Sequence, residues 1–268
     1  MNLWQEKIKL RFGNVDCSDR LTLCAAFAFF QEAAISHAAV LGVGRDAMMQ
    51  NKQAWLLSRL SVFMEQRPGY EEDIIIRSWP RGPEKLFALR DYDISLADKA
   101  LVRGRSGWLV IDLEKRRPLR VEAVTEKLPL NHGLDALLSG PAGLVSRDKL
   151  ALYGERQAAY SDIDYYGHVN NVRYVQWIQD MTAPDLLYNA SQMRLDINYL
   201  GEIQANENIE LYSCSIENSP LSVDYKEDYP ASPSYAFAYE GRRKGESAQA
   251  AQANKGQVVF RAELRLGN

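Results

Sequence analysis

Cysteine and histidine are both scarce in this chain, which contains three of each among 268 residues. Cys17, Cys24 and Cys214 form no C-x-x-C pair and no regular framework, so we expect free thiols in a reducing cytoplasm rather than disulfides. An excess of positive charge is also missing, since the formal net charge is −3. The composition therefore gives no sign of a nucleic-acid-binding surface.

Several catalytic signatures are missing as well. No H-E-x-x-H, Walker or G-x-G-x-x-G pattern occurs, and Gly104 to Gly107 is one residue short of the G-x-S-x-G elbow and lies in a strand-like run. These absences disfavour zinc enzymes, nucleotide-dependent chemistry and serine hydrolases, so we expect no metal and no cofactor. The first twelve residues also lack the apolar core and cleavage site of a secretory signal.

What is present is an ordinary soluble composition, 46% hydrophobic and 25% charged, in a chain long enough for two cores. The first half predicts a strand and then a helix from Leu21 to about Leu41, with Ser18 or Asp19 as its N-cap. That helix is as long as a membrane span, but Gln31 and Glu32 interrupt it, so we expect it to be buried inside the protein and expect no membrane partner. An antiparallel meander follows, with runs at Trp55–Met64, Ile74–Trp79, Leu86–Ile94 and Leu101–Leu113.

The second half repeats this plan. A strand near Tyr153 precedes a helix that is expected to end near Leu187. Strand-like runs follow at Met193–Leu200, Ile209–Ile216, Leu221–Tyr225, Tyr235–Glu240 and Val258–Leu266. Residues 14–21 align on 162–169 with one offset of 148 residues, which places Asp16 on Asp164 and Arg20 on His168. We therefore predict an α+β protein with domains at 1–127 and 151–268 and a Gly- and Pro-containing linker at 128–150.

The segment Tyr160–Asp180 gathers polar residues directly before an apolar helical run: Asp162, Asp164, Gly167, His168, Asn170 and Asn171. At a helix N-terminus, free N–H groups and the helix dipole favour developing negative charge. Helix capping alone would account for such residue types if they were scattered singly. A calcium loop does not fit, because Tyr166 and Arg173 occupy positions that need oxygen ligands.

At these residues the chain resembles the acyl-acyl-carrier-protein thioesterases of plants and bacteria. Their D-x-D-x-N-x-H-V-N-N-V-x-Y signature matches D-I-D-Y-Y-G-H-V-N-N-V-R-Y here, except that Tyr166 replaces the family's Asn. The shorter core of the motif is also similar to single-domain hot-dog thioesterases that cleave acyl-CoA. Segments Q-E-A-A-I-S-H-A, A-W-L-L-S-R-L-S-V-F-M-E-Q-R-P and W-L-V-I-D-L-E-K-R-R-P-L resemble the family's first half.

The resemblance implies a tandem hot-dog fold, in which each of two domains wraps an antiparallel sheet around a long central helix. It implies hydrolysis of fatty acyl carrier protein to free fatty acid and carrier, with catalysis in the C-terminal domain. Asp164 and His168 come from the signature, and Glu202 comes from a Y-x-x-E spacing like that of the family. Ile203 stands where plant members have Cys, so no thiolate mechanism is expected there. Tyr166, Asn170 and Asn171 are the candidates for positioning the substrate and its oxyanion.

Two further sites are predicted in the first half. Small residues Ala25, Ala28 and Ala33, opposite Trp55 and Phe63, are candidates for an acyl pocket, in line with the family's N-terminal specificity domain. The basic cluster Lys115, Arg116, Arg117 and Arg120 is the candidate docking site for an acidic carrier protein, with a solvated loop as the alternative. An acyl-CoA thioesterase, a hot-dog dehydratase and a non-enzymatic acyl-binding module stay open as other functions, and a homodimer is possible.

Overall fold

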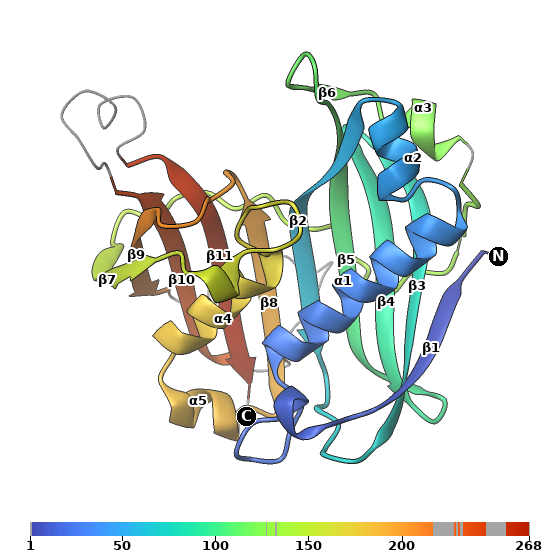
Figure 1. The fold of residues 1–268 in the computed structure, drawn as a ribbon. Coiled ribbons are helices and arrows are strands. Elements are labelled where there is room, and N and C mark those ends of the chain that lie inside the picture. Colours follow the sequence, from blue (N-terminus) through green and yellow to red (C-terminus); the bar gives the residue numbers. More distant parts are fainter. Residues whose placement is uncertain are drawn as a thin grey trace. The chain divides into compact units, whose positions relative to one another are not determined.

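The structure, a computed structural model, describes residues 2–126, 128–131, 133–216, 228, 230, 233–244 and 256–267. The chain divides into two compact units, Met1–Pro141 and Ala142–Asn268. Each unit lays a helix against an antiparallel sheet, which is the predicted α+β arrangement (Figure 1). The predicted strand Leu221–Tyr225 lies outside the described residues.

The first unit is built around α1 (Leu23–Val40), which lies against β3, β4 and β1 (Figure 1). Its sheet has the order β1-β3-β4-β5-β2, with β6 added beside β5. The strands are β1 (Trp4–Lys9), β2 (Gln53–Met64), β3 (Asp73–Glu84), β4 (Phe87–Leu96), β5 (Lys99–Asp112) and β6 (Arg117–Leu119). Short helices α2 (Arg45–Gln50) and α3 (Glu122–Thr125), like β6, were not predicted.

Helix α1 begins later than the sequence predicted. Its N-cap is Thr22, whose hydroxyl accepts a hydrogen bond from the Ala25 backbone N–H, and not Ser18 or Asp19. Asp19 instead sits in a turn with φ of 59°. By length and composition α1 could cross a membrane, but it packs against the sheet and these of its residues are buried: Leu23, Ala25, Ala26, Phe27, Phe30, Ala33, Ala34 and His37.

The second unit has the strand order β7-β9-β10-β11-β8. This order matches that of the first unit, β1-β3-β4-β5-β2, because the strands of each unit, counted along the chain, take the same places in the sheet. Its strands are β7 (Ala151–Gln157), β8 (Gln192–Tyr199), β9 (Asn208–Ser215), β10 (Pro233–Arg243) and β11 (Val258–Gly267). Helix α4 (Asn171–Met181) occupies the place of α1, and α5 (Pro184–Asn189) follows it. The repeated plan in the sequence is thus repeated in the topology.

Two predicted boundaries in this unit were wrong. The helix expected to reach Leu187 stops at Met181, because Pro184 has no N–H to continue the helical hydrogen bonds and Thr182, directly after the helix, is extended. Strand β10 continues to Arg243, beyond the predicted end at Glu240. A side chain at Gly241 would overlap the Phe260 ring, with a Cβ at 2.2 Å from it, so glycine here permits close packing within the sheet.

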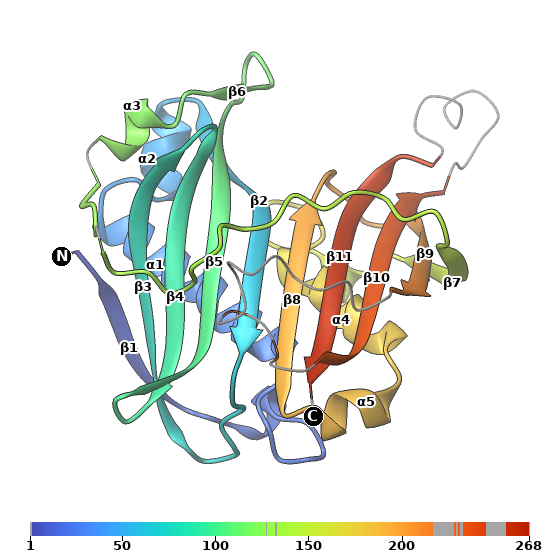
Figure 2. The same ribbon diagram turned by 180° about the vertical axis from the view of Figure 1, so that it is seen from behind.

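The connecting segment, predicted as a linker at 128–150, packs on the sheet faces away from the helices (Figure 2). In the first unit, Asp135 accepts from Arg105 at 2.8 Å, and Ala136 N donates to Asp91 at 2.8 Å. In the second unit, Leu144 N donates to the Asn198 side chain at 2.8 Å. These bonds satisfy buried polar side chains that both sheets carry on their outer faces.

Candidate active site

The loop before α4 is a compact turn that presents His168. Asp164 N donates to His168 O at 2.8 Å and Gly167 N donates to Asp164 O at 3.0 Å. Gly167 has φ of 83°, a left-handed conformation that glycine adopts without strain. The Asp164 carboxylate accepts the Tyr166 backbone N–H at 2.8 Å, which closes the turn.

His168 lies beside Glu202. Val169 N donates to Ile203 O at 2.8 Å, and His168 forms a β-bridge with Gln204, so the backbone aligns the two segments. His168 Nε2 is 3.4 Å from a Glu202 carboxylate oxygen. The side chains are 33% and 58% exposed, so both are open to solvent and to a substrate. An imidazole next to a carboxylate is the arrangement that general acid–base catalysis requires.

The N-terminus of α4 lies directly after this pair. The Asn170 side chain caps the helix by accepting from Val172 N at 2.9 Å. The Asn171 carbonyl accepts from the Tyr199 hydroxyl at 3.1 Å, while its side-chain amide makes no hydrogen bond within the described residues. That amide is therefore available as a donor to an oxyanion.

Tyr174 packs beside the segment that carries Glu202. Its hydroxyl lies 3.5 Å from the Gly201 carbonyl oxygen, next to Glu202, and its ring packs edge-on against Tyr199 and Phe260. Burial, and then the nearby Glu202 carboxylate, raise the pKa of this phenol well above its usual value. Tyr174 thus stays neutral and serves as packing.

Asp164 and Tyr166 make different contacts from the catalytic pair. In the described chain the Asp164 carboxylate makes no hydrogen bond to the His168 ring, and its contact with Tyr166 N stabilises the turn. The Tyr166 ring is 58% exposed and meets Tyr165 edge-on at 6.0 Å between centroids. An orienting or charge-balancing role of Asp164 toward His168 and a positioning role for Tyr166 stay predictions.

Arg243, at the end of β10, was not predicted. Its Nη2 donates to the Glu202 carbonyl at 2.5 Å, its Nε to the Glu207 carboxylate at 3.2 Å, and its Nη1 to Gln257 at 2.6 Å. Arg243 therefore clamps the turn that carries Glu202. No motif signals this role, because Arg243 approaches Glu202 only through the pairing of the strands.

The other predicted residues lie in the first unit. Ala25, Ala33 and Phe63 are buried and Ala28 is partly buried, whereas Trp55 donates to the Val43 carbonyl at 2.9 Å and packs on a cluster around Met48 and Val110. The four basic residues are exposed around the β5–β6 turn: Lys115, Arg116, Arg117 and Arg120.

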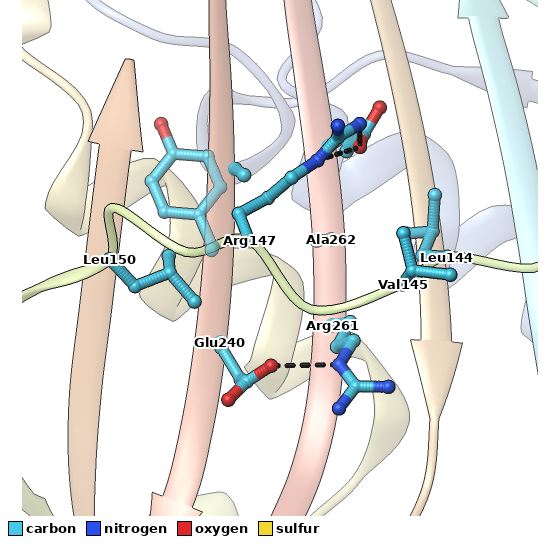
Figure 3. A pocket seen from close by; sticks show the side chains of 10 residues that line it. Leu144, Val145, Arg147, Leu150, Glu240, Arg261 and Ala262 are labelled. Carbon is cyan, nitrogen blue, oxygen red and sulfur yellow. Dashed lines mark hydrogen bonds and ion pairs between the residues drawn. The ribbon is translucent and has the colours of Figure 1, made fainter. Parts of the chain in front are cut away.

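A small pocket in the second unit lies away from this site. Residues 144–150 cross the outer face of the sheet there, over the ion pairs of Glu240 with Arg261 and of Arg147 with Glu263 (Figure 3). Its volume of about 10 Å³ admits little more than a water molecule. No group of three His, Cys, Asp or Glu side chains suited to a metal ion occurs within the described ranges.

The first unit contains a counterpart of the active-site loop. Asp16 N donates to Arg20 O at 3.0 Å, Leu21 N donates to Pro68 O at 2.8 Å, and Val15 bridges Leu21 as Ile163 bridges Val169. Pro68 thus matches Ile203, and Arg67 stands at the place of Glu202. The Arg67 guanidinium forms an ion pair with Asp16 and donates to the Leu21 carbonyl at 2.9 Å.

Family models match both halves of the chain. The acyl-ACP thioesterase N-terminal domain matches residues 1–127, and the acyl-ACP thioesterase C-terminal domain matches residues 147–254. Among curated proteins, the palmitoyl-acyl carrier protein thioesterase of Cuphea hookeriana is 22% identical over 75% of this chain and 52% of its own length. The oleoyl-acyl carrier protein thioesterase of Coriandrum sativum is 22% identical over 77% and 61%. This chain therefore spans only a little over half the length of these relatives.

Solved structures share the fold across the whole chain. An acyl-ACP thioesterase from Bacteroides thetaiotaomicron superposes with a TM-score of 0.76 at 22% identity, covering 98% of this chain and 97% of the other. The 12:0-ACP thioesterase from Umbellularia californica gives 0.74 at 16% identity, covering 98% and 93%. The predicted tandem hot-dog fold is thereby confirmed.

Proposed function

Because this chain belongs to the acyl-ACP thioesterase family, we propose that it hydrolyses the thioester of a fatty acyl carrier protein, releasing the fatty acid and the carrier. The observation that carries the proposal is the solvent-open contact of His168 with Glu202 at 3.4 Å, beside the N-terminus of α4. The matched models support the reaction class, and the contact supplies groups able to perform it.

In the proposed reaction, water held between Glu202 and His168 loses a proton to this pair as its oxygen attacks the thioester carbonyl carbon. The carbonyl oxygen becomes negative, and the Asn171 amide with the α4 N-terminus stabilises it. The carbon–sulfur bond then breaks, and the thiolate takes up the proton from His168. Asn170 holds the helix end in place, and Arg243 holds the turn of Glu202.

The test compares one acyl chain attached either to carrier protein or to CoA. We expect a kcat/KM at least about tenfold higher for the carrier-bound chain. Equal rates on both substrates would contradict selectivity for the carrier and favour an acyl-CoA thioesterase. If the protein binds acyl chains but hydrolyses neither thioester, the non-enzymatic acyl-binding module is the better explanation.

The basic cluster Lys115, Arg116, Arg117 and Arg120 is proposed as the carrier contact, because acyl carrier proteins are acidic and these side chains are exposed. Reversing two of these charges is expected to raise KM for the carrier substrate several-fold and to leave acyl-CoA hydrolysis unchanged. An equal effect on both substrates would reject the cluster as a docking site.

A further inference from the structure

A polar row crosses the helix-facing side of the first sheet. Arg90 on β4 is paired with Ser106 on β5, and Ser78 on β3 lies within 2.9 Å of its guanidinium. His37, in the last turn of α1, covers the row, with its Nδ1 at 3.1 Å from Arg90 Nη1. Arg90 is only 7% exposed, so this cation is enclosed between helix and sheet.

The charge of Arg90 has no carboxylate beside it in the described chain. Both its hydrogen bonds use Nη1, so Nε and Nη2 donate to none of the residues described. The neighbouring carboxylates project to the other face, where Asp91 binds Arg105 at 2.6 Å and Asp93 binds Arg77 at 2.9 Å. Burial accordingly lowers the pKa of Arg90.

One neighbouring donor also lacks an acceptor. Trp4 Nε1 is buried without an acceptor in the described ranges, and its ring lies 6.4 Å from that of His37. Nearby, the Ser106 hydroxyl accepts from Trp108 Nε1 at 2.7 Å and shares a hydrogen bond of 2.8 Å with the Tyr92 hydroxyl, in which either oxygen can donate. Donors of Arg90 and Trp4 that find no acceptor in the described chain are unfavourable by themselves, and an acceptor oxygen that enters makes them favourable.

The surroundings define the rest of the ligand. Leu60 and Ile76 are buried on the neighbouring strands, and Phe30 from α1 stacks on Tyr92 at 4.8 Å between centroids. Buried apolar residues beside one cationic donor suit a hydrocarbon chain that carries one oxygen-bearing group.

We propose that the Arg90 row binds the oxygen of a hydroxyl, keto or carboxyl group on the acyl chain of the substrate, so that the enzyme selects oxygenated chains. The choice of an acyl chain rests on the proposed function. The same acceptor chemistry is available from a small free anion, and the experiments separate these sources.

The first experiment uses acyl thioesters of equal chain length on one carrier. One acyl chain is unsubstituted, three carry a hydroxyl at the third carbon, at a mid-chain carbon or at the terminal carbon, and one ends in a carboxylate. We expect wild type to favour at least one oxygenated chain by about tenfold or more in kcat/KM, since a site built to bind a polar group discriminates against its absence. Arg90→Met should bring that ratio close to one while hydrolysis of the plain chain persists. Equal ratios in wild type and Arg90→Met for every chain would overturn the proposal.

A second measurement does not depend on turnover. Melting temperatures of wild type and Arg90→Met are compared with plain and hydroxylated free fatty acids, and with chloride or acetate at constant ionic strength. Stabilisation by a hydroxylated acid in wild type only supports the site, even if no thioester is hydrolysed and the proposed function fails. Stabilisation by chloride or acetate alone assigns the row to a small anion and overturns the acyl assignment, and no stabilisation by any ligand overturns the site itself. Should Arg90→Met not fold, Arg90→Lys takes its place, with partial retention of both effects expected.

Discussion

The loop at residues 12–22 and the loop at residues 160–170 have matching backbones and different side chains. Each begins with a 3-10 turn, Phe12–Asn14 or Tyr160–Asp162, and each ends at a helix cap, Thr22 or Asn170. The first loop holds a buried Arg67–Asp16 ion pair, and the second holds an exposed His168–Glu202 contact. The two loops thus share a scaffold and differ in their chemistry.

The difference shows why only one loop is suited to proton transfer. A guanidinium keeps its charge throughout the physiological range, so Arg20 and Arg67 cannot give or take a proton during a reaction. An imidazole exchanges its proton near neutral pH. The side chains of Arg67 and Asp16 are only 2% and 14% exposed, which leaves no room for a substrate between them.

The largest expected effect concerns the exposed pair. His168→Ala and Glu202→Gln should each lower kcat by at least about a hundredfold, the scale of a lost general acid or base. Arg20→Ala, at the matching place in the first loop, is the control and should leave kcat unchanged. The rates are measured by steady-state kinetics on variants whose melting curves match that of wild type. Near-normal turnover by folded Glu202→Gln would remove that residue from the mechanism.

Substitution in the buried Arg67–Asp16 pair should lower stability more than substitution in the exposed pair. Arg67→Met removes the partner of Asp16 and is expected to lower the free energy of unfolding by about 2 kcal/mol. Glu202→Met, at the matching position in the second unit, should change it by less than about 0.5 kcal/mol, because that side chain is exposed. Denaturant unfolding compares the two, and equal losses would contradict a division between a structural and a chemical loop.

Arg243 tests how the second loop is held. Arg243→Gln should lower kcat about tenfold with little change in KM, because the Glu202 turn loses its clamp and misplaced groups react slowly. Arg243→Lys should recover part of the rate, since an ammonium can still donate to the Glu202 carbonyl. An equally low kcat in both variants, with lowered melting temperatures, would indicate a purely structural residue.

The smallest effect is expected from acid. Burial raises the pKa of Asp16, but the Ser18 hydroxyl and the Arg67 guanidinium outweigh it and leave the pKa below its usual value. Because the folded value is lower than the unfolded one, the stabilisation is present above about pH 4 and is lost as the pH falls through the folded value. The difference in melting temperature between wild type and Asp16→Asn should therefore shrink below about pH 4, and a constant difference across this range would exclude the effect.

Local patterns predicted most of the regular structure. Alternating apolar residues located β2 and β5 within a few residues, because one face of each strand must be buried. Helix ends were predicted less well, since several nearby residues can cap a helix and here the Thr22 side chain makes the capping hydrogen bond. Short elements such as α2 and β6 lack enough residues for a periodic signal.

The sequence by itself determined the duplicated plan, since the offset that aligns Asp16 with Asp164 also relates the hydrogen bonds of the two loops. It also placed His168 before a helix, because a turn glycine and a capping asparagine act over a few residues. Only the tertiary structure decided which groups meet these residues. Strand pairing and helix packing bring together the partners of Glu202, Arg67, Arg243 and Arg90. Such contacts between distant residues depend on the whole fold rather than on any local pattern.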